Sequence, residues 1–151
     1  MDPGALPAGT AEAAPRDLAW TIPADWKDRP GSGMRVATIA IAAGGGTAEM
    51  SVIALDGSAG GTLANVNRWR GQLGLGEIGE IEFARTAVKV ASAAGEVTVV
   101  EFAGAAGQGS LFGGLLNAKG RTWFFKATGP ANVLAAARAD LMTFIQGLHA
   151  R

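Results

Sequence analysis

The alternation of hydrophobic and polar positions along the chain predicts a sheet built from hairpins. Period-two alternation, the pattern of strands with one buried face, is found at residues 18–22, 35–42, 49–55, 87–91, 96–102, 111–118 and 121–127. Glycines 44–46 lie between the second and third of these segments, and glycine allows the positive φ angles of a tight turn. Ala94-Gly95 and Lys119-Gly120 separate the next two pairs. The sequence therefore predicts three antiparallel hairpins after a short first strand.

The hydrophobic period changes to three or four residues in two segments, which predicts two helices. Residues 62–73 form a short amphipathic helix that ends at Gly74, and a longer helix starts at Gly129-Pro130 with proline in its first position. A helical turn is expected at 79–85. The last helix presents one apolar stripe to the sheet: Leu134, Ala137, Leu141, Phe144 and Leu148. The first presents Leu63, Val66, Trp69 or Arg70, and Leu73 on its apolar side, and Asn65, Arg68 and Gln72 on its polar side.

Strands follow strands rather than alternating with helices, which is typical of an α+β fold. We expect one domain with a mainly antiparallel sheet of about six or seven strands. The short helix follows the second hairpin strand, and the C-terminal helix packs on the sheet and covers one face. Large apolar side chains are densest in residues 122–126, which predicts a central strand there. Residues 1–17 are rich in Ala, Pro and Gly and predict a flexible tether, so the domain is residues 18–151.

Composition excludes several classes of chemistry. The 151 residues include no cysteine and one histidine, His149, two residues from the C-terminus. This excludes thiolate nucleophiles and sulfur-ligated metal sites, and it removes most catalytic triads and imidazole bases. Thirteen basic and thirteen acidic side chains give zero net charge, which argues against a nucleic-acid partner held by the overall field. We therefore expect no cofactor, no metal and no nucleic acid.

The location of the protein in the cell has two interpretations. No apolar run is long enough to span a membrane. A tether that starts abruptly at Met1 is typical of a chain whose leader peptide has been removed, which predicts a periplasmic or lipid-anchored protein. The alternative is a cytoplasmic protein that starts at Met1.

The segment from Asn65 to Gln72, NVNRWRGQ, is the densest set of hydrogen-bond donors in the chain. Its amides and guanidiniums suit a carboxylate, a phosphate or the backbone of a partner. The structural alternative places Trp69 in the core, with the polar residues capping loops and pairing with carboxylates such as Asp56 or Glu101.

Three other groups have both a chemical and a structural interpretation. Glycines 57, 60 and 61 precede a helix, as in a phosphate cradle, but their spacing matches no known loop and also suits a tight turn. Lys126 is either a desolvated amine nucleophile or a solvated strand end. Carboxylates that converge in one cleft would make the protein a histidine-independent hydrolase or transferase. The closest in sequence are Glu77, Glu80 and Glu82, which also suit a solvated acidic turn.

Several blocks resemble an uncharacterised family of bacterial proteins, many of which look like secreted proteins or lipoproteins. The blocks are Pro23 to Trp26, Met34-Arg35, GGTLANVNRWRGQLGL (60–75) and GRTWFFKATGP (120–130). The order of elements is also similar to the fold group of the photosystem PsbP protein and the Ran-binding Mog protein. This resemblance implies a non-catalytic binding or assembly protein of the cell envelope whose partner is a protein or small ligand. The candidate binding residues that it implies are Asn65, Asn67, Arg68, Trp69, Arg70, Gln72, Trp123 and Lys126.

Overall fold

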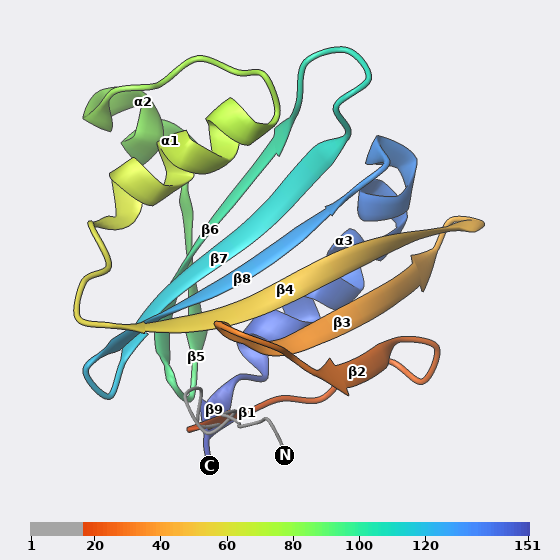
Figure 1. Cartoon of the computed structure of the whole chain (residues 1–151), viewed down its shortest axis with the longest axis vertical. Helices are drawn as coiled ribbons and strands as arrows, with labels where there is room; N and C mark the ends of the chain where they lie inside the picture. Colours follow the sequence, from red (N-terminus) through yellow and green to blue (C-terminus); the bar gives the residue numbers. More distant parts are fainter. Residues whose placement is uncertain (1–16) are drawn as a thin grey trace.

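A seven-stranded antiparallel sheet is the centre of the molecule (Figure 1). The computed structural model describes residues 17–151. The sheet order is β2 (Lys27–Pro30), β3 (Arg35–Ala43), β4 (Gly46–Asp56), β8 (Arg121–Gly129), β7 (Ser110–Ala118), β6 (Gly95–Ala103) and β5 (Val88–Ser92). Neighbouring strands all pair antiparallel. The α+β class and the central position of the strand that carries residues 122–126 are confirmed.

The three predicted hairpins form, and their turns show why the sequence specifies them. Gly44 and Gly45 connect β3 to β4 with φ angles of 59° and 78°. Lys119 and Gly120 connect β7 to β8 with φ angles of 55° and 77°. Two consecutive residues with positive φ match the right-handed twist of the flanking strands. The glycines in these turns thus fix where each hairpin reverses.

The long C-terminal helix α3 (Ala131–Gln146) lies across one side of the sheet. Its stripe from Leu134 to Phe144 is buried against residues such as Trp123 and Phe125 of β8, and Leu148, predicted on the same stripe, is buried there just after the helix ends. The predicted packing of this helix is confirmed, but Pro130 is its N-cap rather than its first residue. A proline at that boundary still removes no hydrogen bond from the helix.

The other side of the sheet carries α1 (Thr62–Gln72) and α2 (Glu80–Thr86). Trp69 and Val66 of α1 pack on Phe124 of β8 in a second core. The expectation that only one face is covered is therefore wrong, because alternate residues of β8 send large aromatic rings to both sides. The helical period predicted Asn65 on the polar side of this helix, and that prediction is wrong. The side chain is 2% exposed and lies on the buried side of α1.

Of three short strands, the sequence predicted one, β1 (Leu18–Ala19), and contained no clear signal for β2 and β9 (His149–Ala150). The expected strand at 18–22 is limited to β1, which pairs with β9. The edge strand β2 has the sequence KDRP, whose side chains are exposed or half-buried and do not alternate. The predicted tether at 1–17 falls almost entirely outside the described residues. Its last residue, Asp17, accepts a backbone hydrogen bond from Arg151.

Candidate functional site

Both candidate indoles belong to the core. Trp123 is fully buried on the α3 side and stacks on Phe125, with ring centroids 6.4 Å apart. Trp69 is 2% exposed and lies over Gly113 of β7, where a Cβ atom would overlap its ring. The structure supports a packing role for these two residues, because neither ring is exposed enough to contact a ligand.

Three other candidates hold neighbouring loops. Asn65 Nδ2 donates to the carbonyls of Ala59 and Gly61, at 2.9 and 2.7 Å, and so fastens the turn before α1. Asn67 exchanges two hydrogen bonds with the backbone of Ile78, at 2.8 and 3.0 Å. Arg70 holds the same loop. These contacts favour the structural interpretation for the amides.

Arg70 completes this loop framework. Its Nε donates to the carbonyl of Gly76 at 2.7 Å, and its guanidinium lies 5.5 Å from the ring centroid of Phe102. Within residues 17–151, the expected carboxylates pair with other cations: Asp56 with Arg121, and Glu101 with Arg138. The expectation that the α1 arginines pair with Asp56 or Glu101 is therefore wrong.

The remaining three candidates, Arg68, Gln72 and Lys126, come together beside the uncovered part of the sheet. Lys126 Nζ donates to Gln72 Oε1 at 2.9 Å, which joins β8 to the last turn of α1. Burial lowers the pKa of Lys126, and the positive charges of Arg68 and Arg35 lower it further. The side chain is thus a half-buried ammonium with two guanidiniums nearby.

The strand register shows what surrounds Lys126. It lies on the same side as Phe124, two residues earlier, and therefore on the α1 side. Lys126 is directly opposite Ser51 of β4, which is opposite Thr38 of β3, which is opposite Arg29 of β2. Residues directly opposite each other in neighbouring strands point to the same face. We call the α1 side of β2, β3 and β4 the open half, because no helix among residues 17–151 lies over β2 or β3 there (Figure 1).

Positive charge dominates the open half. Arg35 Nη1 bonds the hydroxyl of Thr38 at 3.2 Å and pairs with Glu49 at 3.4 Å. The register places two further cations, Lys27 and Arg29, on the same face. Within residues 17–151, no carboxylate pairs with Lys27, Arg29, Arg68 or Lys126. Because cations that share a partly desolvated surface repel one another, this arrangement favours an anion.

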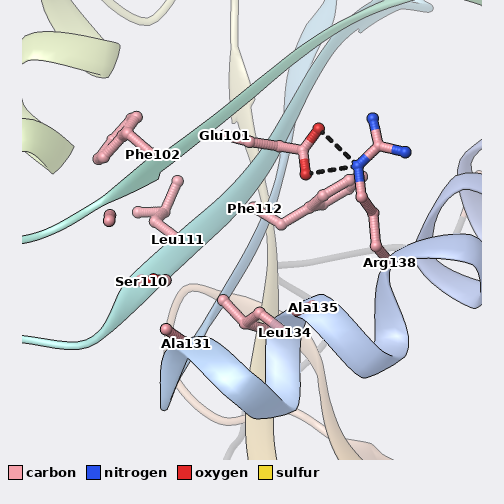
Figure 2. Close-up of a pocket in the computed structure, with 10 residues that line it drawn as sticks. Glu101, Phe102, Ser110, Leu111, Phe112, Ala131, Leu134, Ala135 and Arg138 are labelled. Carbon is pink, nitrogen blue, oxygen red and sulfur yellow. Dashed lines mark hydrogen bonds and ion pairs between the residues drawn. The ribbon is translucent and has the colours of Figure 1, made fainter.

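Two concave sites were missed by the sequence reasoning. A pocket of about 280 Å³ lies where β6 and β7 meet the start of α3, and Figure 2 shows the Glu101–Arg138 pair at one end of its apolar lining. Arg138 Nε donates to both carboxylate oxygens, at 2.8 and 3.0 Å. A larger groove of about 600 Å³ lies between α1 and α2. The first forms where two strands meet a helix of a later segment and the second between two helices, so neither is marked by a local pattern.

The acidic side chains do not assemble a catalytic cleft in the described part of the chain. Glu77, Glu80 and Glu82 are exposed. Asp17 and Asp56 do converge, but on the guanidinium of Arg121, which forms an ion pair with each of them. Residues 17–151 contain no cluster of three metal-ligating side chains.

Comparison with known proteins shows the fold. Neither a family model nor a curated protein matches the sequence. The cyanobacterial PsbP protein CyanoP of Synechocystis sp. PCC 6803 matches with a TM-score of 0.55 and 12% identity, over 99% of this chain and all of that one. LpqN, described as involved in cell envelope biogenesis of Mycobacterium tuberculosis, matches with a TM-score of 0.52 and 10% identity, over 87% of this chain and 82% of LpqN.

A Bacteroides thetaiotaomicron structure matches with a TM-score of 0.51 and 12% identity over 89% of this chain, which spans only 45% of that protein. The fold is PsbP-like. At these identities the likeness extends to the fold alone, since one fold hosts many functions. Among the helices of residues 17–151, none is long and apolar enough to cross a membrane.

Proposed function

We propose that this protein is a non-catalytic binding or assembly protein of the cell envelope, and that it binds an acidic group on the open half. The observation that carries the proposal is the half-buried ammonium of Lys126, which has the guanidiniums of Arg68 and Arg35 near it and a single amide acceptor, Gln72. Bringing an anion to this cluster offsets the repulsion among its charges.

The proposed geometry uses charged and neutral donors together. Lys126 and Arg68 hold the anion between β8 and α1, and the hydroxyls of Ser51 and Thr38 continue the row toward β2. Half-buried alanines 40 and 42 of β3 are small and leave the backbone of this strand accessible. A floor of small residues flanked by cations suits an extended acidic chain better than a bulky apolar ligand.

The envelope location rests on the tether composition and on the likeness to LpqN, whose description places it in envelope biogenesis. The leader peptide upstream of Met1 and membership of the uncharacterised bacterial family remain predictions. The genomic sequence before Met1 tests the leader, since a ribosome-binding site directly before Met1 would contradict it. The carboxylate-based hydrolase or transferase has no support from the described carboxylates.

Binding of a fluorescein-labelled hexaglutamate peptide, followed by fluorescence anisotropy, tests the acidic-ligand proposal. Lys126→Met and Arg68→Gln each remove a charged donor, which is expected to weaken binding roughly tenfold, about 1.4 kcal/mol. Lys119→Gln is the matched control, because it removes one positive charge in the distant β7–β8 turn. Binding is also expected to weaken as salt is added.

Two outcomes contradict the proposal. One is equal affinity of the Lys126→Met, Arg68→Gln and Lys119→Gln proteins, which would make the interaction a general effect of charge. The other is equal affinity for hexaglutamate and for a neutral hexaglutamine peptide. A thermal scan of each variant verifies that it is folded.

A further inference from the structure

The α1 side of the sheet is raised on one half and bare on the other. The helices α1 and α2, which we call the helical layer, stand on the β6–β8 half, where Trp69 and Leu73 pack on Val100 and Leu115. The open half beside it carries no helix among residues 17–151 (Figure 1). The helical layer therefore projects beside an uncovered surface. A second copy rotated by 180° would place its own helical layer on that surface.

Charge is divided within the helical layer: α1 carries Arg68 and Arg70, whereas the loop and α2 carry the acidic side chains. The stretch from the end of the loop through α2 exposes Glu77, Glu80 and Glu82 against one cation, Arg85, for a net charge of −2 by count. The open half, with Arg68 at its border, exposes cations in excess over its one carboxylate, Glu49. These cations are Lys27, Arg29, Arg35, Lys126 and Arg68. The charges of residues 77–86, rather than of the whole helical layer, are therefore complementary to those of the open half.

Exposed apolar side chains accompany both charged surfaces. The helix α2 has no buried residue, and its Ile81 is 74% exposed. Met34, 62% exposed, directly precedes Arg35 at the start of β3. Large apolar side chains are thus exposed on α2 and at the turn before β3, next to the charged residues of both surfaces.

We propose that two copies of this chain associate through their α1 sides, with the helical layer of each seated on the open half of the other. A two-fold axis that passes near α1 generates the contact between helical layer and open half twice and closes the assembly at a dimer. In each contact, Glu80 and Glu82 of one copy meet Arg29 and Arg35 of the other. Ile81 of the first copy approaches the end of the other copy's open half that lies near Met34. The same axis prevents further growth, because both complementary surfaces of each copy are then covered.

This inference rests on the proposed function, because it names one acidic occupant of the open half. An acidic ligand and the second copy therefore compete for the same cations of the open half. Ligand binding to the monomer therefore shifts the equilibrium away from the dimer by mass action.

A charge-swap experiment by sedimentation equilibrium tests the dimer. The face variant carries Arg29→Glu and Arg35→Glu, and the helix variant carries Glu80→Lys and Glu82→Lys. Each variant alone places like charges across both contacts and is expected to be monomeric where the wild type is dimeric. An equimolar mixture restores opposite charges at both contacts, so it is expected to dimerise again. Asp140→Lys, on the exposed side of α3, is the control and is expected to remain dimeric.

The results separate this inference from the proposed function. A wild-type protein that stays monomeric at low salt up to roughly 200 µM, well above the Kd of a stable dimer, overturns the dimer, as does a mixture of the two variants that fails to associate. Hexaglutamate binding with a monomeric wild type leaves the proposed function intact. The helix variant is expected to be monomeric with its open half unchanged. If it does not bind hexaglutamate, and if the peptide does not dissociate the wild-type dimer, the proposed function is overturned instead.

Discussion

Gly113 lies beneath the indole of Trp69, and the absence of a side chain there makes room for the ring. A Gly113→Ala change is expected to lower the free energy of unfolding by about 1–3 kcal/mol, since the ring must shift in a packed core. Gly71 in α1 has nothing within 4 Å of where its Cβ would lie. Gly71→Ala is therefore expected to stabilise the protein by about 0.5–1 kcal/mol. Urea denaturation of both variants checks this prediction, and the same sign for both would contradict it.

Trp69 itself anchors α1 to the sheet. Trp69→Ala leaves a cavity between α1 and Phe124 and is expected to cost about 3–5 kcal/mol of stability, as for other large-to-small core changes. Arg68→Ala, one residue away and exposed, is expected to change stability by less than about 0.5 kcal/mol. Thermal unfolding monitored by circular dichroism measures both. A loss above about 2 kcal/mol for Arg68→Ala would show that its guanidinium has a structural partner.

Lys126 gives the stability a defined pH dependence. Its pKa in the folded chain is lowered by burial, by Arg68 and by Arg35, so the unfolded chain binds the proton more tightly. The contribution of Lys126 to the free energy of unfolding therefore rises as pH increases from the folded pKa to the ordinary value of 10.5. Lys126→Met is expected to abolish this rise, and Lys119→Met to retain it. Chemical denaturation at pH values on both sides of the window measures the difference.

At the scale of elements, α2 is held by its connections more than by its own packing. It buries none of its residues, and the loop before it is tied to α1 by the two hydrogen bonds between Asn67 and Ile78. Only Phe83 packs against the second core from this helix. The position of α2 over the sheet thus depends on Asn67, on the Arg70–Gly76 hydrogen bond in the same loop and on the packing of Phe83.

Asn67→Ala is expected to loosen the 73–79 loop and α2 while the sheet stays intact. The loss of two hydrogen bonds predicts about 1–3 kcal/mol of destabilisation. Hydrogen exchange at the Ile78 amide is expected to accelerate, because this amide donates to Asn67 Oδ1. Asn132→Ala, exposed in the first turn of α3, is the control and is expected to leave the exchange at Ile78 unchanged.

At the scale of the whole molecule, the ends of the described chain meet. β1 pairs with β9, and Arg151 donates its backbone N–H to Asp17 at 2.9 Å. Leu18, which β9 holds in place, is 1% exposed in the main core. The pair therefore closes one end of the α3 core (Figure 1).

Deletion of residues 149–151 is expected to destabilise the protein by roughly 1–3 kcal/mol, since it removes several backbone hydrogen bonds beside buried Leu18. For a chain of this length each kcal/mol lowers Tm by about 2–4 °C. Arg151→Gln keeps the backbone and is the control. Scanning calorimetry measures both proteins, and an unchanged Tm after the deletion would show that the β1–β9 pair contributes nothing.

The sequence alone predicted most of the fold and part of the site. Hairpin turns are local, because Gly44, Gly45 and Gly120 adopt the positive φ angles of a tight turn without steric cost, and the α3 stripe follows from helical period. The burial of Asn65 could not be predicted from the helical period. The period does not show that this amide donates hydrogen bonds to the backbone of the turn before its own helix. Of the eight candidate residues, only Arg68, Gln72 and Lys126 converge on one surface, and no spacing rule joins residue 72 to residue 126.

By itself, the sequence determined the local geometry: period two for the strands, period three to four for the helices, and glycines at the reversals. It also limited the chemistry, since a chain without cysteine and with one histidine has few catalytic groups. Only the tertiary structure decided that helices lie on both sides of the sheet, because β8 sends aromatic rings to both faces and its sequence does not show which helix covers which face. It alone placed Arg29, Thr38, Ser51 and Lys126 in one row, because strand order and register depend on packing across the whole sheet.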